Sequence, residues 1–147
     1  MHIFLDSSVL LSFCRSKRGA SALIIDYCIQ RKVKLYISEK VVYEVQKNNE
    51  EDSNELGKSR FTAVLNQDLL TVIEDPTPEE IETADKAINN RKDAPIIAAA
   101  KKIAKIKYIL SFDEGFFTQK VQAFVKSIEI LKPGAFVSRF RKELDRI

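Results

Sequence analysis

The chain has 147 residues, a net charge of +3, 45% hydrophobic residues and 31% charged residues. This composition is typical of a globular domain and excludes a disordered or collagen-like chain, so we expect a single domain over residues 1–147. The most apolar stretch, residues 94–110, carries four lysines, which argues against a membrane span. The first residues lead directly into an apolar segment without the features of a signal peptide, which favours a cytoplasmic protein.

Two cysteines and one histidine limit the chemistry that the chain can perform. Cys14 and Cys28 lack C-x-x-C spacing, so we expect each to be a buried, reduced thiol. His2 is alone, which excludes catalysis by a pair of histidines. Without further His or Cys ligands at suitable spacing, a zinc hydrolase is excluded as well.

The predicted elements alternate between strands and helices. In chain order they are a strand at 2–5, a helix at 7–13, a basic loop at 15–19, a helix at 20–31, a strand at 34–37, a helix capped at 38, a polar loop or frayed helix end at 46–57, a helix at 60–68, a strand at 69–73, a helix at 77–90, a helix opening at 93, a strand at 108–110, a helix at 116–124, a strand at 127–131 and a final amphipathic helix after 134. The first, third and fourth strands are continuous apolar runs, typical of strands buried in a parallel sheet. The pattern predicts an α/β fold with helices on both faces of that sheet.

Charge is distributed unevenly along the chain. Residues 1–34 carry +4, residues 35–85 carry −9 and residues 86–147 carry +8. Basic ends around an acidic middle suit a protein that holds a polyanion on one side. A solvated surface with local bias is the alternative reading of the same pattern.

Four acids are expected near the carboxyl edge of the sheet, where ligands bind in open parallel sheets. Asp6 and Asp113 follow the first and fourth strands, and Asp93 opens a helix. Glu44 lies on the helix after the second strand, beside its apolar stripe. Taken singly, the aspartates suit helix caps and the glutamate suits a helix surface.

Together, four carboxylates at one edge would repel one another unless a cation neutralised them. Oxygen ligands without His or Cys suit Mg²⁺ or Mn²⁺. An acidic pocket flanked by basic loops fits phosphodiester hydrolysis, in which a metal activates water while Lys and Arg hold the nucleic-acid backbone. The candidates for backbone contacts, each equally consistent with solvated surface, are Arg15, Lys17, Arg18, Lys92, Arg139 and Arg141.

Four segments resemble the PIN-domain nucleases, and most closely the VapC-like toxin ribonucleases of prokaryotic toxin–antitoxin pairs. The matching segments are IFLDSSVL at 3–10, SEKVVYEV at 38–45, KDAPIIAAA at 92–100 and YILSFDEGF at 108–116. Each is weak alone, but the four together, in order and at family-like separations, span nearly the whole chain.

The resemblance implies a three-layer α/β/α sandwich with a five-stranded parallel sheet of order 3-2-1-4-5. It also implies a metal site made by Asp6, Glu44, Asp93 and Asp113. The supporting hydroxyl positions of the family are filled by Ser8 and Ser111, where Thr or Asn is commoner. Glu114, directly after Asp113, is either a further ligand or a solvated acid at a helix start.

The implied activity is a divalent-metal-dependent endoribonuclease, the toxin of a type II pair with a cognate antitoxin. A metal-activated water would attack phosphorus in line and leave a 5′-phosphate and a 3′-hydroxyl. A PIN-domain nuclease of RNA processing outside a toxin pair and a non-catalytic RNA- or protein-binding module are the alternatives. The apolar helices between residues 20 and 75 suit either a homodimer surface or core packing.

Two further protein classes fit the sequence less well. A phosphatase with Asp6 as its nucleophile needs a second acid two residues later, where Ser8 stands. A Rossmann-type nucleotide-binding protein needs a G-x-G-x-x-G motif after the first strand, which the chain lacks.

Overall fold

The computed structural model describes residues 1–146, so the last residue of the predicted domain, 147, lies outside the described range. Five parallel strands form one sheet in the order β3-β2-β1-β4-β5, which confirms the expected topology. The strands are β1 (His2–Leu5), β2 (Lys34–Ser38), β3 (Leu70–Ile73), β4 (Tyr108–Leu110) and β5 (Glu129–Leu131).

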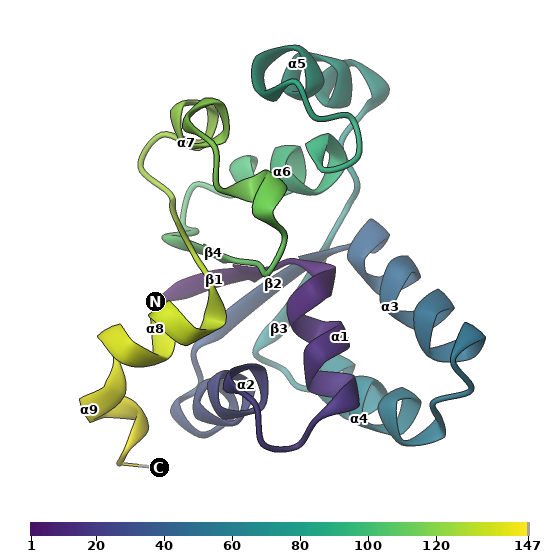
Figure 1. The fold of residues 1–147 in the computed structure, drawn as a ribbon, viewed down its shortest axis with the longest axis vertical. Helices are drawn as coiled ribbons and strands as arrows, with labels where there is room; N and C mark the ends of the chain where they lie inside the picture. Colours follow the sequence, from purple (N-terminus) through teal and green to yellow (C-terminus); the bar gives the residue numbers. More distant parts are fainter. Residues whose placement is uncertain (147) are drawn as a thin grey trace.

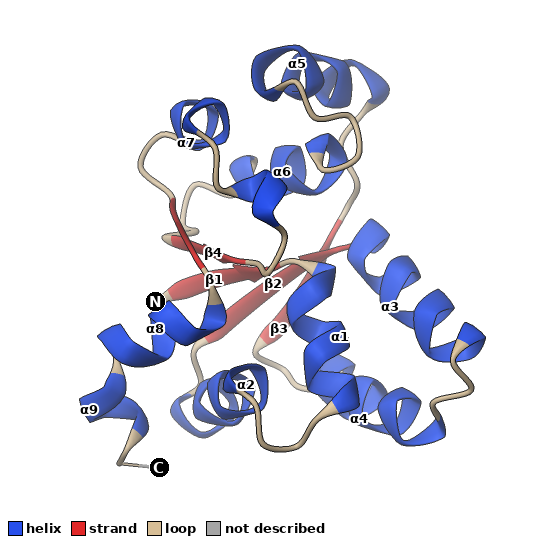
Figure 2. Ribbon diagram, viewed as in Figure 1, coloured by secondary structure: helices blue, strands red, loops and turns tan. Residues whose placement is uncertain are grey.

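Helices cover both faces of the sheet, as the strand pattern predicts (Figures 1 and 2). On one side lie α1 (Ser7–Arg15), α2 (Ala20–Arg31), α3 (Glu39–Glu51), α4 (Glu55–Leu65), α8 (Pro133–Arg139) and α9 (Arg141–Leu144). On the other side lie α5 (Pro78–Ile88), α6 (Ala94–Lys101), the short 3-10 helix η1 (Glu114–Phe116) and α7 (Gln119–Val125). The molecule is therefore a three-layer α/β/α sandwich.

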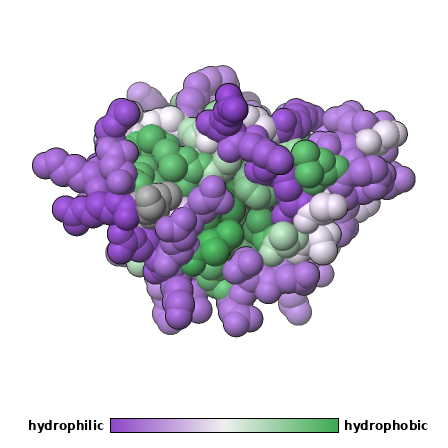
Figure 3. Space-filling view, turned by 90° about the horizontal axis from the view of Figure 1, so that it is seen from below, coloured by the Kyte–Doolittle hydropathy of each residue, from purple (hydrophilic) through white to green (hydrophobic). Residues whose placement is uncertain are grey.

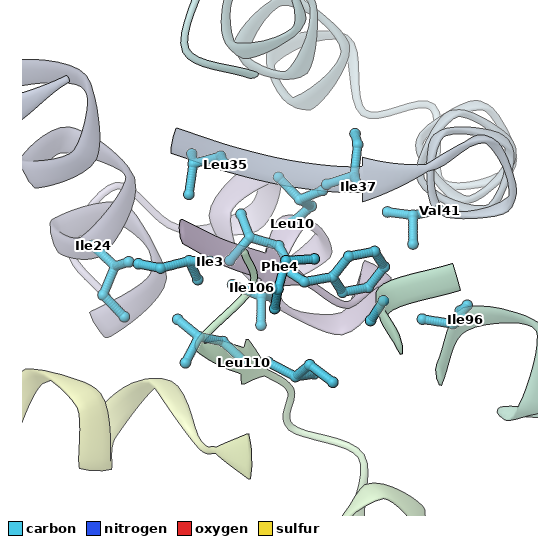
Figure 4. Close-up of a cluster of buried hydrophobic side chains, with 14 of the residues drawn as sticks. Ile3, Phe4, Leu10, Ile24, Leu35, Ile37, Val41, Ile96, Ile106 and Leu110 are labelled. Carbon is cyan, nitrogen blue, oxygen red and sulfur yellow. The ribbon is translucent and has the colours of Figure 1, made fainter. Parts of the chain in front are cut away.

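The central strand β1 is the middle of the core. Ile3, Phe4 and Leu5 are fully buried, because β1 pairs with β2 on one side and β4 on the other while helices cover both faces. Figure 4 shows Ile3 and Phe4 between Ile24 of α2 and Ile96 of α6. Burial at the centre fixes the strand register, and the register fixes which residues emerge at the carboxyl edge.

The polar segment 46–57, expected to be a loop or a frayed helix end, is mostly helical. It forms the end of α3, a short turn and the start of α4. Asn49 is buried and donates to the Cys14 Sγ at 3.4 Å, and Asn54 donates to the Cys14 carbonyl at 3.3 Å. The segment is more regular than a loop because Asn49 and Asn54 contact α1, while most of its other polar side chains face water.

Three smaller features also differ from the sequence-based expectation. The strand β3 is an edge strand, so Val72 is exposed although its segment is apolar. The final helix divides into α8 and α9 at Phe140, whose backbone leaves the helical region. The expected helix at 116–124 is divided in the same way, because Thr118 caps a new helix, α7, after η1.

Within residues 1–146, no helix is both long enough and apolar enough to cross a membrane. Cys14 and Cys28 are both buried free thiols, as expected. Burial raises the pKa of the Cys28 thiol to about 12, so this cysteine is unsuited to nucleophilic chemistry.

Candidate active site

The candidate site lies where β1 and β4 end side by side. The Asp6 N–H donates to the Leu110 carbonyl at 3.0 Å, and this bond continues the pairing of the two strands past their last residues. The segments that follow, α1 and the loop leading to η1, therefore start from the same point of the carboxyl edge (Figure 1). This is the edge at which open parallel sheets bind ligands.

Asp6 is held by serine hydroxyls on both neighbouring segments. Asp6 is buried, with only 3% of its surface exposed. Ser8 Oγ and Ser111 Oγ each donate to Asp6 Oδ2 at 2.7 Å. A charged carboxylate without a cationic partner is costly to bury unless hydrogen bonds stabilise it, and these two hydroxyls stabilise Asp6. The other carboxylate oxygen, Oδ1, has one long contact of 3.4 Å, from the Ser7 hydroxyl.

Glu44 contributes a buried oxygen that lacks a partner. It lies on α3, whose first turn is capped by Ser38, and the residue is half-buried. Its Oε1 is buried and finds no hydrogen-bond partner among residues 1–146. Burial raises the pKa of Glu44 and the negative charge of Asp6 adds to the effect, whereas Lys40, Lys92 and a contact with the Ser7 hydroxyl oppose it. A buried carboxylate oxygen without a hydrogen-bond partner, in the field of a second acid, is suited to a cation.

Asp93 is a buried acid held by an asparagine. The residue is 4% exposed and precedes α6, but its side chain does not cap that helix. Asn90 Nδ2 donates to Asp93 Oδ2 at 2.7 Å, and Asn90 Oδ1 accepts the Asp93 N–H at 3.1 Å. Burial nevertheless raises the pKa of Asp93 to about 6, with a further contribution from the nearby charge of Asp113.

Asp113 shares a hydrogen bond with Asp93 and stays ionised. Burial acts to raise the pKa of Asp113, but the N–H of Gly115, the Asp93 carboxyl and Lys92 outweigh it, so the pKa lies below its usual value. Gly115 donates to Asp113 Oδ1 at 2.8 Å, and Lys92 Nζ lies 3.5 Å from Asp113 Oδ2. A side chain at Gly115 would meet Asp93 Oδ2 at 2.5 Å, so the close approach of the backbone requires glycine here.

Both pairs of acids therefore lie at one edge of the sheet. Asp6 interacts with Glu44, and Asp93 interacts with Asp113. The negative charges of Asp113, Asp93 and Asp6 all raise the pKa of Lys92. Over residues 1–146, no three His, Cys, Asp or Glu side chains come close enough together to hold one ion. The electrostatic interactions within the site link the four acids of the predicted metal site in two pairs, Asp6 with Glu44 and Asp93 with Asp113.

The donor set still fits a hard divalent cation. All four donors are carboxylates, which Mg²⁺ and Mn²⁺ prefer. The Glu44 Oε1 atom has no hydrogen-bond partner in the described part of the chain, and burial, with a smaller effect of the Asp113 charge, raises the pKa of Asp93 to about 6. A cation at this edge would give Oε1 a partner and favour the charged form of Asp93.

The predicted basic residues lie at different places on the molecule. Lys92 lies beside Asp113, whereas Arg15 is the last residue of α1, at the end of that helix away from Asp6. Lys17 lines a separate groove with Phe13 and Arg60, and Arg18 is exposed in the loop before α2. Arg139 pairs with Glu129 at 2.6 Å and Arg141 lies 3.9 Å from Asp145. Because Glu129 is the first residue of β5, Arg139 lies at the opposite end of the sheet from the acids.

The sequence analysis did not single out two residues that matter at this edge. Asn90 anchors Asp93 through both of its amide atoms, and the signal for it was the N-x-x-D spacing after the left-handed residue Asn89. Phe112 is exposed between Ser111 and Asp113, and the signal for it was the apolar residue out of phase with the strand. Glu114 is exposed and forms an ion pair with Lys132, as expected of a solvated acid.

The fold and the acidic edge together define a three-layer α/β protein with a polar site at the carboxyl ends of its parallel strands. The chain belongs to the PIN domain family: the family's model matches residues 2–115. Members of this family are nucleases that generally use divalent metals. The match confirms the resemblance to PIN-domain proteins stated above.

Two solved structures show the same fold at low sequence identity. One is PAE2754 from Pyrobaculum aerophilum, which is 16% identical, with a TM-score of 0.63 and coverage of 97% of this chain and 90% of that one. The other is VapBC2 from Rickettsia felis bound to a DNA fragment from their promoter, which is 13% identical, with a TM-score of 0.66 and coverage of 90% of this chain and 98% of that one. Among curated protein sequences, none matches this chain.

Proposed function

We propose that the protein is a divalent-metal-dependent endoribonuclease that hydrolyses phosphodiester bonds in single-stranded RNA. The observation that carries the proposal is a set of four acids at one edge of the sheet: the buried, serine-held Asp6 with Glu44, which feels its charge, and Asp93 with Asp113. The membership of the PIN domain family supports it. Asp6, Glu44, Asp93 and Asp113 would hold Mg²⁺ or Mn²⁺ and are the proposed catalytic residues.

The chain's own groups have distinct tasks in this proposal. The cation, when bound, neutralises phosphate oxygens and lowers the pKa of a water molecule. Ser8 and Ser111 fix the orientation of Asp6, and Asn90 fixes that of Asp93, so both acids are positioned before substrate arrives. Lys92 contributes a positive charge beside Asp113 and suits a phosphate of the incoming strand. The products would carry a 5′-phosphate and a 3′-hydroxyl.

The variant Asp6→Asn tests the proposed activity. It preserves the size of the side chain but removes the charge, so we expect cleavage of RNA to fall by at least about 100-fold, since metal stabilisation is worth several kcal/mol. The assay compares Mg²⁺, Mn²⁺ and EDTA on unstructured RNA, and circular dichroism verifies the fold. Asp68→Asn is the matched control, because Asp68 is exposed just before β3, away from the carboxyl edge. Undiminished, EDTA-sensitive cleavage by Asp6→Asn would contradict the assignment.

We propose further that the ribonuclease is the toxin of a type II pair and acts in the cytoplasm, where its RNA substrate is. A surface suited to a partner supports this: in Figure 3, apolar side chains gather in the centre of the face seen from below and are rimmed by hydrophilic ones. A groove among α1, α2 and α4 combines apolar residues with charged ones, and its lining is Phe13, Lys17, Asp26, Ile29, Arg60, Ala63, Val64 and Gln67. An antitoxin or a second copy of the chain would cover such a surface.

Co-expression with the product of the neighbouring reading frame distinguishes the toxin hypothesis from that of an RNA-processing nuclease. For a toxin, expression of the chain alone should arrest growth, and the neighbouring product should bind the chain and restore growth. Cleavage activity without growth arrest would favour the RNA-processing alternative instead. Light scattering of the purified chain then determines whether it is a homodimer.

A further inference from the structure

A shallow groove runs beside the acidic edge and is not used by the proposed metal site. Its free volume is about 430 Å³, within the range of small-ligand sites. The lining residues come from α1 and from the loop after β4, and they are Ser8, Leu11, Ser12, Arg15, Ser16 and Phe112. The groove therefore begins at Ser8, the residue that holds Asp6, and extends along α1.

Phe112 stands at the inner end of this groove with an exposed ring. The residue is 42% exposed although its neighbour Ser111 is fully buried. Its backbone N–H donates to Ser8 Oγ at 3.0 Å, and the same hydroxyl donates to Asp6 Oδ2 at 2.7 Å. One hydroxyl thus fixes the aromatic residue relative to the acid. A single exposed apolar residue is ordinary on a protein surface, but one fixed this close to a candidate metal ligand suggests contact with the substrate.

Arg15 stands at the other end of the groove, two turns along α1. Its guanidinium donates to Asn48 Oδ1 at 2.8 Å and lies 3.4 Å from Asp52 Oδ2. Both partners of the ion pair are more than half exposed, so the pair is weak and exchangeable. A phosphate would replace Asp52 as the partner of Arg15 with little loss.

We propose that Phe112 is a stacking platform for a base of the RNA strand next to the cleaved phosphate, with Arg15 contacting the strand's backbone. The proposal rests on the ribonuclease function proposed above and identifies how that site would hold its substrate. An aromatic ring stacks on any base, because every base has a π-face. The platform would therefore position the strand without selecting a sequence at that nucleotide.

The composition of the groove favours RNA over a protein partner. Only Leu11 and Phe112 are apolar, and the other lining residues carry hydroxyls or a positive charge. This small apolar area suits one planar base between polar backbone contacts. A docked protein would need a larger apolar surface at the centre of its interface.

RNA binding by chains that carry Asp6→Asn tests the proposal without cleavage. Adding Phe112→Ala should weaken binding of a single-stranded oligonucleotide by roughly 5- to 150-fold, the range for one lost base–aromatic stack. Phe112→Tyr should retain binding because it keeps the ring. Phe117→Ala is the matched control, since Phe117 is 36% exposed on the same segment but lies against Lys132 and outside the groove.

An abasic scan of the oligonucleotide distinguishes stacking from a structural effect. Removing one base near the cleavage site should weaken binding by about the same factor as Phe112→Ala, and the two changes together should weaken it no further. Unchanged binding by Phe112→Ala, or effects that multiply at every position of the scan, would overturn the proposal. In either case, metal-dependent cleavage by the chain with Asp6 intact shows whether the ribonuclease function itself survives.

Discussion

The burial of Asp93 at the candidate site lowers the stability of the folded protein near neutral pH. Asp93 is 4% exposed, and its burial raises its pKa to about 6 from the usual 3.8. Between these values the folded protein retains a proton that the unfolded chain has lost. The stability due to protonated Asp93 is therefore fully present below about pH 3.8 and is lost as the pH rises through about 6.

We expect Asp93→Asn to be more stable than the unchanged chain near neutral pH, in EDTA. The amide retains the hydrogen-bonding shape and removes the buried charge, so the gain should be about 1–3 kcal/mol, at 1.36 kcal/mol per pKa unit. The gain should vanish below about pH 4, where the unchanged Asp93 is protonated too. Urea unfolding at both pH values measures the two differences. An equal gain at both would show that the effect does not come from ionisation.

At the scale of elements, the alternation of strands and helices was predictable and the α3–α4 hairpin was not. Apolar runs mark β1 and β4 directly, and Thr77 with Pro78 marks the start of α5 through a capping box. Asn49, by contrast, is polar and yet buried against Cys14. Such a contact depends on which helix lies opposite, and this information is not in the local sequence.

Asn54→Ala tests how the hairpin is held. Asn54 Oδ1 accepts the Gly57 N–H at 2.9 Å as the cap of α4, and its Nδ2 donates to the Cys14 carbonyl. Losing the cap and this bond should lower the free energy of unfolding by about 1–2 kcal/mol. Thermal or urea unfolding measures the loss, and the exposed Ser59→Ala in α4 is the control. Equal stability of the two variants would mean that the cap contributes nothing.

At the scale of the whole molecule, the sequence predicted a cluster of acids that the topology then brings together in pairs. Asp6 and Asp113 follow adjacent parallel strands, so their proximity follows from the sheet order alone. The role of Asn90 depends on the geometry of the loop before α6. The separation of Arg139 from the acids depends on its pairing with Glu129 at the amino end of β5. The uneven charge along the chain predicts a polyanion partner but does not say which basic residues would face it.

The salt dependence of RNA binding distinguishes the basic residues that face the strand from those that do not. Lys92 lies beside Asp113 at the carboxyl edge, whereas Arg139 is paired with Glu129 at the opposite end of the sheet. Each phosphate contact on a single strand contributes about −0.7 to the slope of log affinity against log salt. We expect Lys92→Ala, in the Asp6→Asn chain, to make the slope shallower by about this amount and Arg139→Ala to leave it unchanged. Titrations of labelled RNA over a series of salt concentrations measure the slopes. If Arg139→Ala changed the slope and Lys92→Ala did not, the RNA would bind at the amino ends of β4 and β5, away from the four acids.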